Sequence, residues 1–203
     1  MSNATATKSR QWVNENSVAE FIPYSVHLDE NTIKTTSGYY LQVIKIDGRA
    51  HESADPEDVI NWKEQLNGLL KNIASPNISL WTNIIRREEN TFPGGEFEEG
   101  SFAEQLNNKY KNHVGKNNMM VNELYLTVLY RPSGIPGVNL LQRFEKNVES
   151  IKRIQAEAIE GLHEVVNTVT SSLKHYGARV LGCYDRKGIK NSEVLEFFSY
   201  LIN

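Results

Sequence analysis

The residues of this sequence whose types and spacing could support chemistry are the histidines, a lone cysteine and a glycine-rich segment. The five histidines show no HxxxH, HExxH or Cys-His spacing of the kind that binds a metal ion. Cys183 is the single cysteine, so it cannot form a disulfide within the chain, and we interpret it as a small hydrophobic residue of a strand. We therefore expect no catalytic residue and no metal site.

The glycine-rich segment, Gly94–Gly100, is the remaining candidate for nucleotide chemistry. A phosphate-binding loop reads GxxxxGK[ST], because main-chain amides surround the phosphates, the lysine reaches the β and γ groups and the hydroxyl binds magnesium. The sequence does not contain this motif, and Glu96, Glu98 and Glu99 would repel a nucleotide. We interpret the segment as an exposed loop or a partner-contact loop, and we expect this chain to be no enzyme and to hold no cofactor.

Composition predicts an ordinary globular domain. The chain has 203 residues, of which 39% are hydrophobic and 23% charged, and its net charge of −3 provides no long-range attraction to nucleic acid. Residues 1–16 predict a disordered tail, and Ser2-Asn3-Ala4 in it resembles the remnant of an expression vector. Residues 17–203 predict one domain, without any run of roughly 18 apolar residues that would span a membrane.

Six segments rich in β-branched or aromatic residues and bounded by turn formers predict strands. They are Ile22–Leu28, Thr32–Thr35, Tyr39–Asp47, Ile78–Arg87, Glu123–Arg131 and Ala178–Asp185. In the third of these, Ile44 and Ile46 point to one face and Leu41 and Val43 to the other. This strand should therefore be central and covered on both faces.

Helical spacing predicts four helices between and after the strands. The first begins at Asp55-Pro56 and ends near Ser75-Pro76, with an apolar stripe of Val59, Trp62, Leu66, Leu69 and Ile73. A shorter helix, about Ser101–His113, carries Phe102, Leu106 and Tyr110 on one side. A very long one runs from about Val138 to Tyr176, about 55 Å at 1.5 Å per residue, with Gly161 as a bend and Gly177 as a left-handed cap. The last begins at the capping residue Ser192, and its apolar stripe reaches Asn203, from which we expect that the natural protein continues.

The order of these elements predicts an α+β fold. Two β-α-β units in series, one around the first helix and one around the long helix, predict a ferredoxin-like split β-α-β core. The N-terminal strand and hairpin, the helix at Ser101–His113 and the C-terminal helix are additions to this core.

Five segments of the chain resemble, in the same order, the start of the large ATPase of bacterial type IV secretion systems, the CagE/TrbE/VirB family. The segments are Phe21–Gly48, Leu80-Trp81-Thr82 through Arg86-Arg87, Phe92-Pro93-Gly94-Gly95-Glu96-Phe97, Asn122–Thr127 and Glu193–Phe198. The resemblance implies an N-terminal assembly or anchoring domain that lacks its motor domain. For the parent protein it implies a P-loop ATPase that uses ATP and magnesium in the missing motor domain, forms a homo-oligomer and lies at the cytoplasmic face of the inner membrane.

The partners that this resemblance implies are the motor domain and other inner-membrane components of the secretion system, including a small membrane-embedded subunit. Our candidate interface comprises Arg86, Arg87, Phe92, Gly94, Gly95, Glu96 and Phe97. An acidic run from Glu88 to Glu104 either keeps a loop in solution or docks a basic partner.

Two alternatives come from other classes of protein: a stand-alone ferredoxin-like nucleotide binder and a nucleic-acid-binding module. For the second, Arg86 and Arg87 would form a basic spot with Arg131 if their strands are neighbours, and exposed aromatic residues would stack on bases. The aromatic candidates are Tyr39, Tyr40, Trp81 and Tyr125. The net charge and the lack of an RNA-recognition consensus argue against direct nucleic-acid binding.

Overall fold

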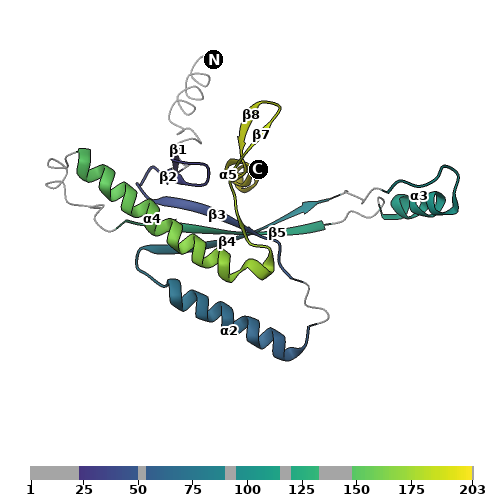
Figure 1. Ribbon diagram of the computed structural model, residues 1–203, viewed down its shortest axis with the longest axis horizontal. Helices are drawn as coiled ribbons and strands as arrows, with labels where there is room; N and C mark the ends of the chain where they lie inside the picture. The colour runs from purple at the N-terminus through teal and green to yellow at the C-terminus, as the bar shows by residue number, and fades with distance from the viewer. Residues whose placement is uncertain (1–22, 50–53, 90–94, 115–119, 133–147, 203) are drawn as a thin grey trace, which may run out of the picture.

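The computed structural model describes residues 23–49, 54–89, 95–114, 120–132 and 148–202. Its main sheet contains β1 (Tyr24–His27), β2 (Ile33–Thr35), β3 (Tyr40–Ile46), β4 (Ile78–Glu88), β5 (Met120–Tyr130) and β6 (Arg179–Val180). A separate hairpin consists of β7 (Cys183–Arg186) and β8 (Ile189–Ser192). The helices are α2 (Pro56–Ile73), α3 (Phe102–Val114), α4 (Val148–Ser172), the 3-10 turn η3 (Lys174–Tyr176) and α5 (Glu193–Ile202). The chain is therefore α+β, as the sequence predicts (Figure 1).

Two β-α-β units interleave in the sheet. The strand order is β1-β2-β3-β5-β4, with β6 also on β3, and every pair is antiparallel. Strand β5 thus separates β3 from β4, the two strands that α2 connects, and β3 separates β5 from β6, the two strands that α4 connects. Each unit is split by a strand of the other, which is the arrangement of a split β-α-β fold.

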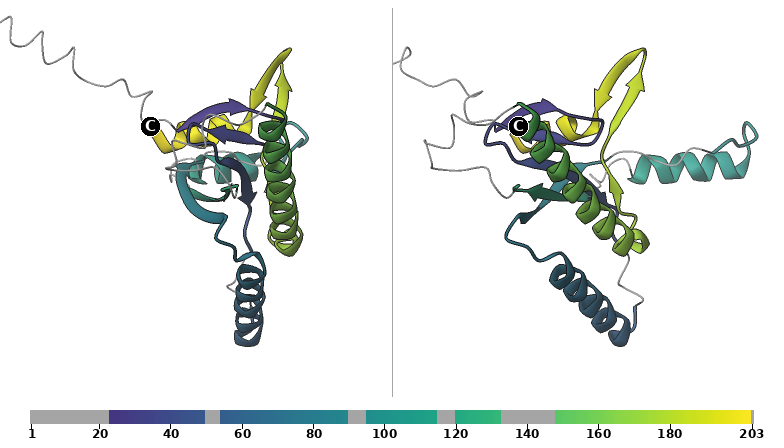
Figure 2. Two further views of the ribbon diagram at one scale, coloured as in Figure 1. Left: turned by 90° about the vertical axis from the view of Figure 1, so that its left-hand side faces the viewer. Right: turned by 60° about the vertical axis from the view of Figure 1, so that its left-hand side comes forward.

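The central strand β3 is covered on both faces, as its alternation predicts. Ile44 and Ile46 pack into a core beneath α4 and the end of α2, whereas Leu41 and Val43 pack into a second core beneath α5. Figure 2 shows α4 and α5 on opposite sides of the sheet. This seven-residue strand contributes side chains to both cores and is therefore the central strand of the sheet.

The apolar stripe of α2 is buried only at its C-terminal end. Leu69 and Ile73 are buried, but Val59 and Leu66 are each 47% exposed. Pro56 lies in the first turn as predicted, and the predicted cap Asp55 makes no side-chain capping hydrogen bond. The helix therefore extends beyond the sheet, as Figure 1 shows below α4.

Two predicted boundaries need correction. The expected strand Ala178–Asp185 breaks after Val180, and its second half turns away to pair with β8, a strand that the sequence analysis missed. Lys187 and Gly188 both have positive φ, 54° and 77°, which is the geometry of a tight two-residue hairpin turn. The long helix is described from Val148 and ends at Ser172, so it is about 37 Å long over that range, and its predicted start falls outside the described residues. The predicted tail, residues 1–16, also lies outside them.

Other details of the sequence analysis are confirmed. Ser192 caps α5, because its Oγ accepts a hydrogen bond from the Leu195 amide at 3.3 Å. Gly177 is left-handed, with φ of 67°. Gly161 lies where α4 meets the sheet, since a Cβ there would come within 2.9 Å of the Tyr130 hydroxyl, while the predicted bend at this residue stays a prediction.

We expect Gly177→Ala to lower the free energy of unfolding by about 1–2 kcal/mol, because an L-residue is strained in the left-handed region. The new Cβ would also lie 2.6 Å from Asp47 Oδ2. Gly68→Ala is the matched control: Gly68 is exposed within α2 and has no atom within 4 Å of an added Cβ, so alanine should raise stability by about 0.5–1 kcal/mol. Chemical denaturation measures both, and equal effects of the two variants would contradict the expectation.

Candidate protein-interaction site

A charged hollow lies on the α5 side of the sheet, with a volume of about 200 Å³. At its centre the Glu123 carboxylate accepts hydrogen bonds from Lys45 Nζ at 2.7 Å and Arg87 Nη2 at 3.2 Å. The Tyr125 hydroxyl donates to the same carboxylate at 2.9 Å. Adjacent strands β3, β4 and β5 supply these groups, so sheet register alone brings them together.

The electrostatics of Glu123 follow from its partners. Burial of the carboxylate opposes ionisation, but the hydrogen bonds from Arg87, Lys45 and Tyr125 outweigh burial and lower the pKa of Glu123 to about 2. Burial and the neighbouring Glu123 charge raise the pKa of the Tyr125 hydroxyl. Both groups therefore hold one protonation state throughout the physiological range.

A second ion pair, between Arg179 and Glu193, also lines this hollow. Arg179 donates to both carboxylate oxygens of Glu193, at 2.8 and 2.9 Å, and the Gly182 amide donates to the same carboxylate at 3.0 Å. The hydrogen bond from Arg179 lowers the pKa of Glu193. This pair ties the first residue of α5 to the end of β6.

The hollow has the properties of a structural network. Each of its three cations, Lys45, Arg87 and Arg179, is already paired with a carboxylate. A phosphate or a carboxylate ligand would have to displace those partners, which costs the hydrogen bonds already formed. The sequence analysis missed this network, although a lysine in the apolar run of β3 was a signal for it.

The structure separates the residues of the predicted interface. Arg87 belongs to the charged network around Glu123 and also contacts Glu89, whereas its neighbour Arg86 is exposed. Gly95, Glu96 and Phe97 lie in the segment before α3, where the Phe97 ring lies within 2.9 Å of a Cβ built on Gly95. Phe92 and Gly94 are outside the described residues.

The predicted basic spot is wrong. Arg86 pairs with Asn122 near the far end of the β4–β5 ladder, while Arg131 follows the end of β5 and its amide bonds to Asn77 O, just before β4 begins. Antiparallel pairing therefore puts these arginines at opposite ends of the ladder.

The alternative of an aromatic stacking platform, which the sequence analysis argued against, does not fit the structure. Tyr40 and Tyr125 are buried, at 4% and 5% exposure, and they belong to the two different cores of the sheet. Phe197 of α5 stacks on Tyr125 with ring centroids 4.5 Å apart. The added helix α5 covers Tyr125 on one face of the sheet, whereas Trp81 is 53% exposed, so the four residues do not form one stacking surface.

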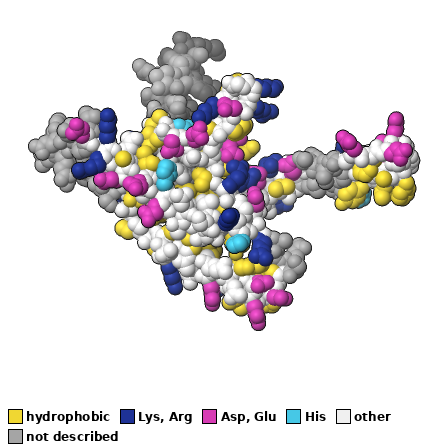
Figure 3. All heavy atoms as spheres, viewed as in Figure 1, with side chains coloured by type: hydrophobic (Ala, Val, Ile, Leu, Met, Phe, Trp, Pro, Cys, Tyr) yellow, Lys and Arg dark blue, Asp and Glu magenta, His cyan; other side chains and the backbone are white. Residues whose placement is uncertain are grey.

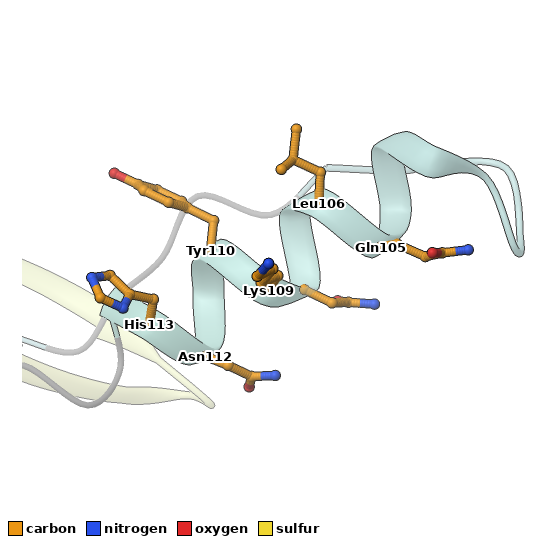
Figure 4. Close-up of a pocket in the computed structure, with 7 residues that line it drawn as sticks. Gln105, Leu106, Lys109, Tyr110, Asn112 and His113 are labelled. Atoms are coloured by element: carbon orange, nitrogen blue, oxygen red, sulfur yellow. The ribbon is translucent and has the colours of Figure 1, made fainter.

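Exposed apolar side chains also lie on an arm, which we define as residues 95–114 together with the distal ends of β4 and β5. Figure 1 shows the arm extending away from the sheet with α3 at its end, and Figure 3 shows hydrophobic side chains gathered along one side of it. Phe102, Leu106 and Tyr110 are 80%, 55% and 58% exposed. The sequence placed these three on one side of a helix, from which Figure 4 shows Leu106 and Tyr110 projecting, but it could not show how far they are exposed.

The end of the arm has a well-defined helix start. Ser101 Oγ accepts a hydrogen bond from the Glu104 amide at 3.1 Å, and the Glu104 side chain reaches back to the Gly100 amide at 2.6 Å. These contacts satisfy free amides of the first turn in the manner of a capping box. Glu104, one residue of the acidic run that was expected either to keep a loop in solution or to dock a basic partner, therefore stabilises the start of α3.

Comparison with known proteins identifies the family. Residues 31–136, just over half of the chain, match the model of the type IV secretion system ATPase VirB4/TrbE, N-terminal domain. The chain belongs to this family. The matched range contains β2 to β5, and therefore the whole arm of this VirB4/TrbE domain.

Curated relatives agree with this assignment. The type IV secretion system protein virB4 of Brucella suis biovar 1 is 34% identical over 208 aligned positions, which cover 98% of this chain and 25% of that protein. The virB4 protein of Bartonella henselae is 32% identical, covering 90% and 24%, and PtlC of Bordetella pertussis is 31% identical, covering 93% and 23%. The chain spans about a quarter of the length of these relatives. Within the part of this VirB4/TrbE domain that the structure describes, no helix combines the length and apolarity of a membrane span.

Proposed function

We propose that this VirB4/TrbE N-terminal domain is a non-catalytic assembly module that anchors the ATPase motor to inner-membrane components of the secretion system. In this role the domain lies in the cytoplasm at the membrane periphery. Its partners are its own motor domain, further copies of the parent protein and membrane components that include a small membrane-embedded subunit. ATP and magnesium act in the motor domain.

The observation that carries this proposal is the exposed apolar side of α3, presented at the end of the arm. Apolar residues gathered on one exposed patch are typical of a protein-contact surface. The distal ends of β4 and β5 belong to a paired ladder whose other end lies in the cores of the sheet. The charged hollow supports a non-catalytic role, because each of its cations is paired with a carboxylate of the same chain.

The test is recovery of the membrane complex with an arm-deleted parent protein. Glu88 and Met120 are directly paired, so an Asn-Gly turn in place of residues 89–119 can join β4 to β5 in register. We expect the full-length parent with this replacement to keep ATP turnover and to lose at least tenfold in recovery of membrane components. Unchanged recovery would contradict the assembly role of the arm, and a parent that lacks residues 21–203 is the positive control for loss.

A calorimetric titration of the isolated chain with ATP and magnesium tests the alternative of a nucleotide-binding module. We expect no binding heat, because the paired cations offer no free phosphate site in the charged hollow. Stoichiometric binding would count against the non-catalytic assembly role. Titration with single-stranded DNA at low salt is the corresponding test for a nucleic-acid module.

A further inference from the structure

Strand β4 forms an open edge of the main sheet. In the strand order β1-β2-β3-β5-β4 it pairs with β5 on one side, and among the described residues no strand pairs with its other side. At alternate residues of such a strand, the backbone N–H and C=O groups point away from the sheet. These groups can accept a further extended strand along the edge.

The middle of β4 contains none of the features that keep an edge strand from pairing. Its eleven residues pair with β5 without a register shift, so no bulge turns the edge away. The run Ile78–Ile85, ISLWTNII, contains no proline, no glycine and no charged residue. The opposite edge differs, because β1 has only four residues and a register shift between Tyr24 and Val26. Of these two edges, β4 is therefore the one suited to strand addition.

Apolar side chains stand beside this edge on both faces of the sheet. Trp81 is 53% exposed and Ile84 is 70% exposed. Successive residues of a strand point to opposite faces, so these two side chains lie on different faces. Ile84 shares its face with Ile78 and Leu80, which pack against the core beneath α4. A strand added to the edge should therefore carry apolar residues on both of its faces.

Helix α2 extends past the same edge. Figures 1 and 2 show it projecting below the sheet, on the side where β4 is the last strand. Its C-terminal residues Leu69 and Ile73 pack into the core beneath α4, whereas Val59 and Leu66 of the same stripe are each 47% exposed. The exposed part of this stripe would face a sheet that continued beyond β4.

We propose that the β4 edge binds β4 of a second copy of this chain, in an antiparallel pair that joins the two sheets into one. The inference rests on the further copies of the parent protein proposed above as partners, and it assigns their contact to one edge. With eleven residues, β4 is the longest edge strand of the described chain, so it is the strand that a second copy can best offer. The contact is isologous, since the same edge serves both chains.

One occupant would satisfy both open surfaces. The strand of the second copy would pair with the edge, and its sheet would lie next to the exposed part of α2. A lipid surface does not fit the edge, because lipid tails offer no partner to backbone N–H and C=O groups. The second copy is therefore the occupant that accounts for the edge and for the overhanging helix together.

The two-fold axis of such a pair is perpendicular to the sheet and passes beside a residue that faces its own copy. We place it at Asn83. This register puts Trp81 of one chain against Ile85 of the other on one face. On the opposite face it puts Thr82 against Ile84. Aromatic and β-branched residues then meet across the strands, which is a favourable combination.

Charge favours the antiparallel direction. Arg86 is the first charged residue after the apolar run of β4. In the antiparallel register it faces Leu80 of the other copy, and the two Arg86 positions are about 20 Å apart along the strands at 3.3 Å per residue. A parallel pair would put Arg86 directly against Arg86, and like charges in directly opposite positions are destabilising.

Sedimentation equilibrium of the isolated chain up to about 1 mM tests the proposal. We expect reversible dimerisation of the natural sequence and at least a tenfold weaker association for Ile84→Lys, because a lysine on an edge strand blocks pairing. Ile189→Lys is the matched control: Ile189 is 66% exposed on β8, so the same substitution at a similarly exposed position away from β4 should leave association unchanged. A monomeric natural chain, or equal effects of the two variants, would overturn the proposal.

Cysteine cross-linking in a Cys183→Ser background tests the direction of pairing. Asn83→Cys should form disulfide dimers with itself, because directly opposite residues of paired strands lie within the range that a disulfide spans. Ser79→Cys lies on the same face of β4, but its two copies would be about 26 Å apart, so it should not cross-link. Equal cross-linking of the two variants would indicate a parallel pair and overturn the proposal.

Membrane-complex recovery by the full-length parent with Ile84→Lys separates this inference from the proposed function. Retained recovery, together with lost self-association of the chain, supports the β4 pairing. If the natural chain stays monomeric while the parent still recovers membrane components, the pairing is overturned and the assembly function stands. If the natural chain stays monomeric and Ile84→Lys abolishes recovery, the edge belongs to a membrane component, and the pairing is overturned as well.

Discussion

Replacing Phe197 by alanine is expected to lower the free energy of unfolding by about 3–5 kcal/mol, because a large buried ring is lost and a cavity remains. Phe197 is 1% exposed, stacks on Tyr125 and lies among the residues of the core beneath α5. The result would establish that α5 is an integral part of the domain. Chemical denaturation followed by circular dichroism measures the effect.

Leu195→Ala is the control for this prediction. Leu195 lies on the same helix but is 50% exposed, so its truncation should cost less than about 1 kcal/mol. Similar losses for the two variants would mean that α5 does not dock on the sheet through Phe197.

Replacing Glu123 by glutamine is expected to cost about 2 kcal/mol at neutral pH, because it removes a carboxylate that accepts charged hydrogen bonds from Lys45 and Arg87. Since the folded state lowers the pKa of Glu123 to about 2, the stabilisation is fully present above the ordinary carboxyl pKa of 4.5 and declines as the pH falls towards 2. The difference between the natural chain and the variant should therefore shrink over this window. Denaturation curves at pH 7, 4.5 and 2.5 measure it.

Glu157→Gln provides the matched comparison. Glu157 pairs with Arg153 one turn away on α4, but both side chains are exposed, at 68% and 76%, so the substitution should change stability by less than about 0.5 kcal/mol. A Glu123 effect that does not depend on pH would contradict the role of its ionised form.

The sequence predicted β3 and its two covered faces because alternation is a local property. Leu41 and Val43 against Ile44 and Ile46 already specify two cores, and only a central strand can bury both. The order of strands and helices likewise predicted the interleaved units. In contrast, the break after Val180 depends on where β3 offers a free edge, since β2 already pairs with the other end of that strand.

The charged hollow and the arm could not be predicted in the same way. Lys45, Arg87 and Glu123 are far apart in sequence, and only the register of three strands brings them within hydrogen-bonding distance. The same register explains why Arg86 and Arg131 do not meet. The alternatives of a basic spot and of an aromatic platform could not be decided from the sequence for this reason, because residue type does not specify which strand end or which face is left free.

The sequence by itself determined the α+β class, the family resemblance, the central strand and the amphipathic side of α3. These features follow from local periodicity and from the order of residues along the chain. Both can be recognised without knowing which residues are in contact. Only the tertiary structure decided that the cations of the charged hollow are paired and that Phe102 and Leu106 of α3 are exposed. Pairing and exposure depend on which distant elements pack together, and that packing is a property of the whole fold.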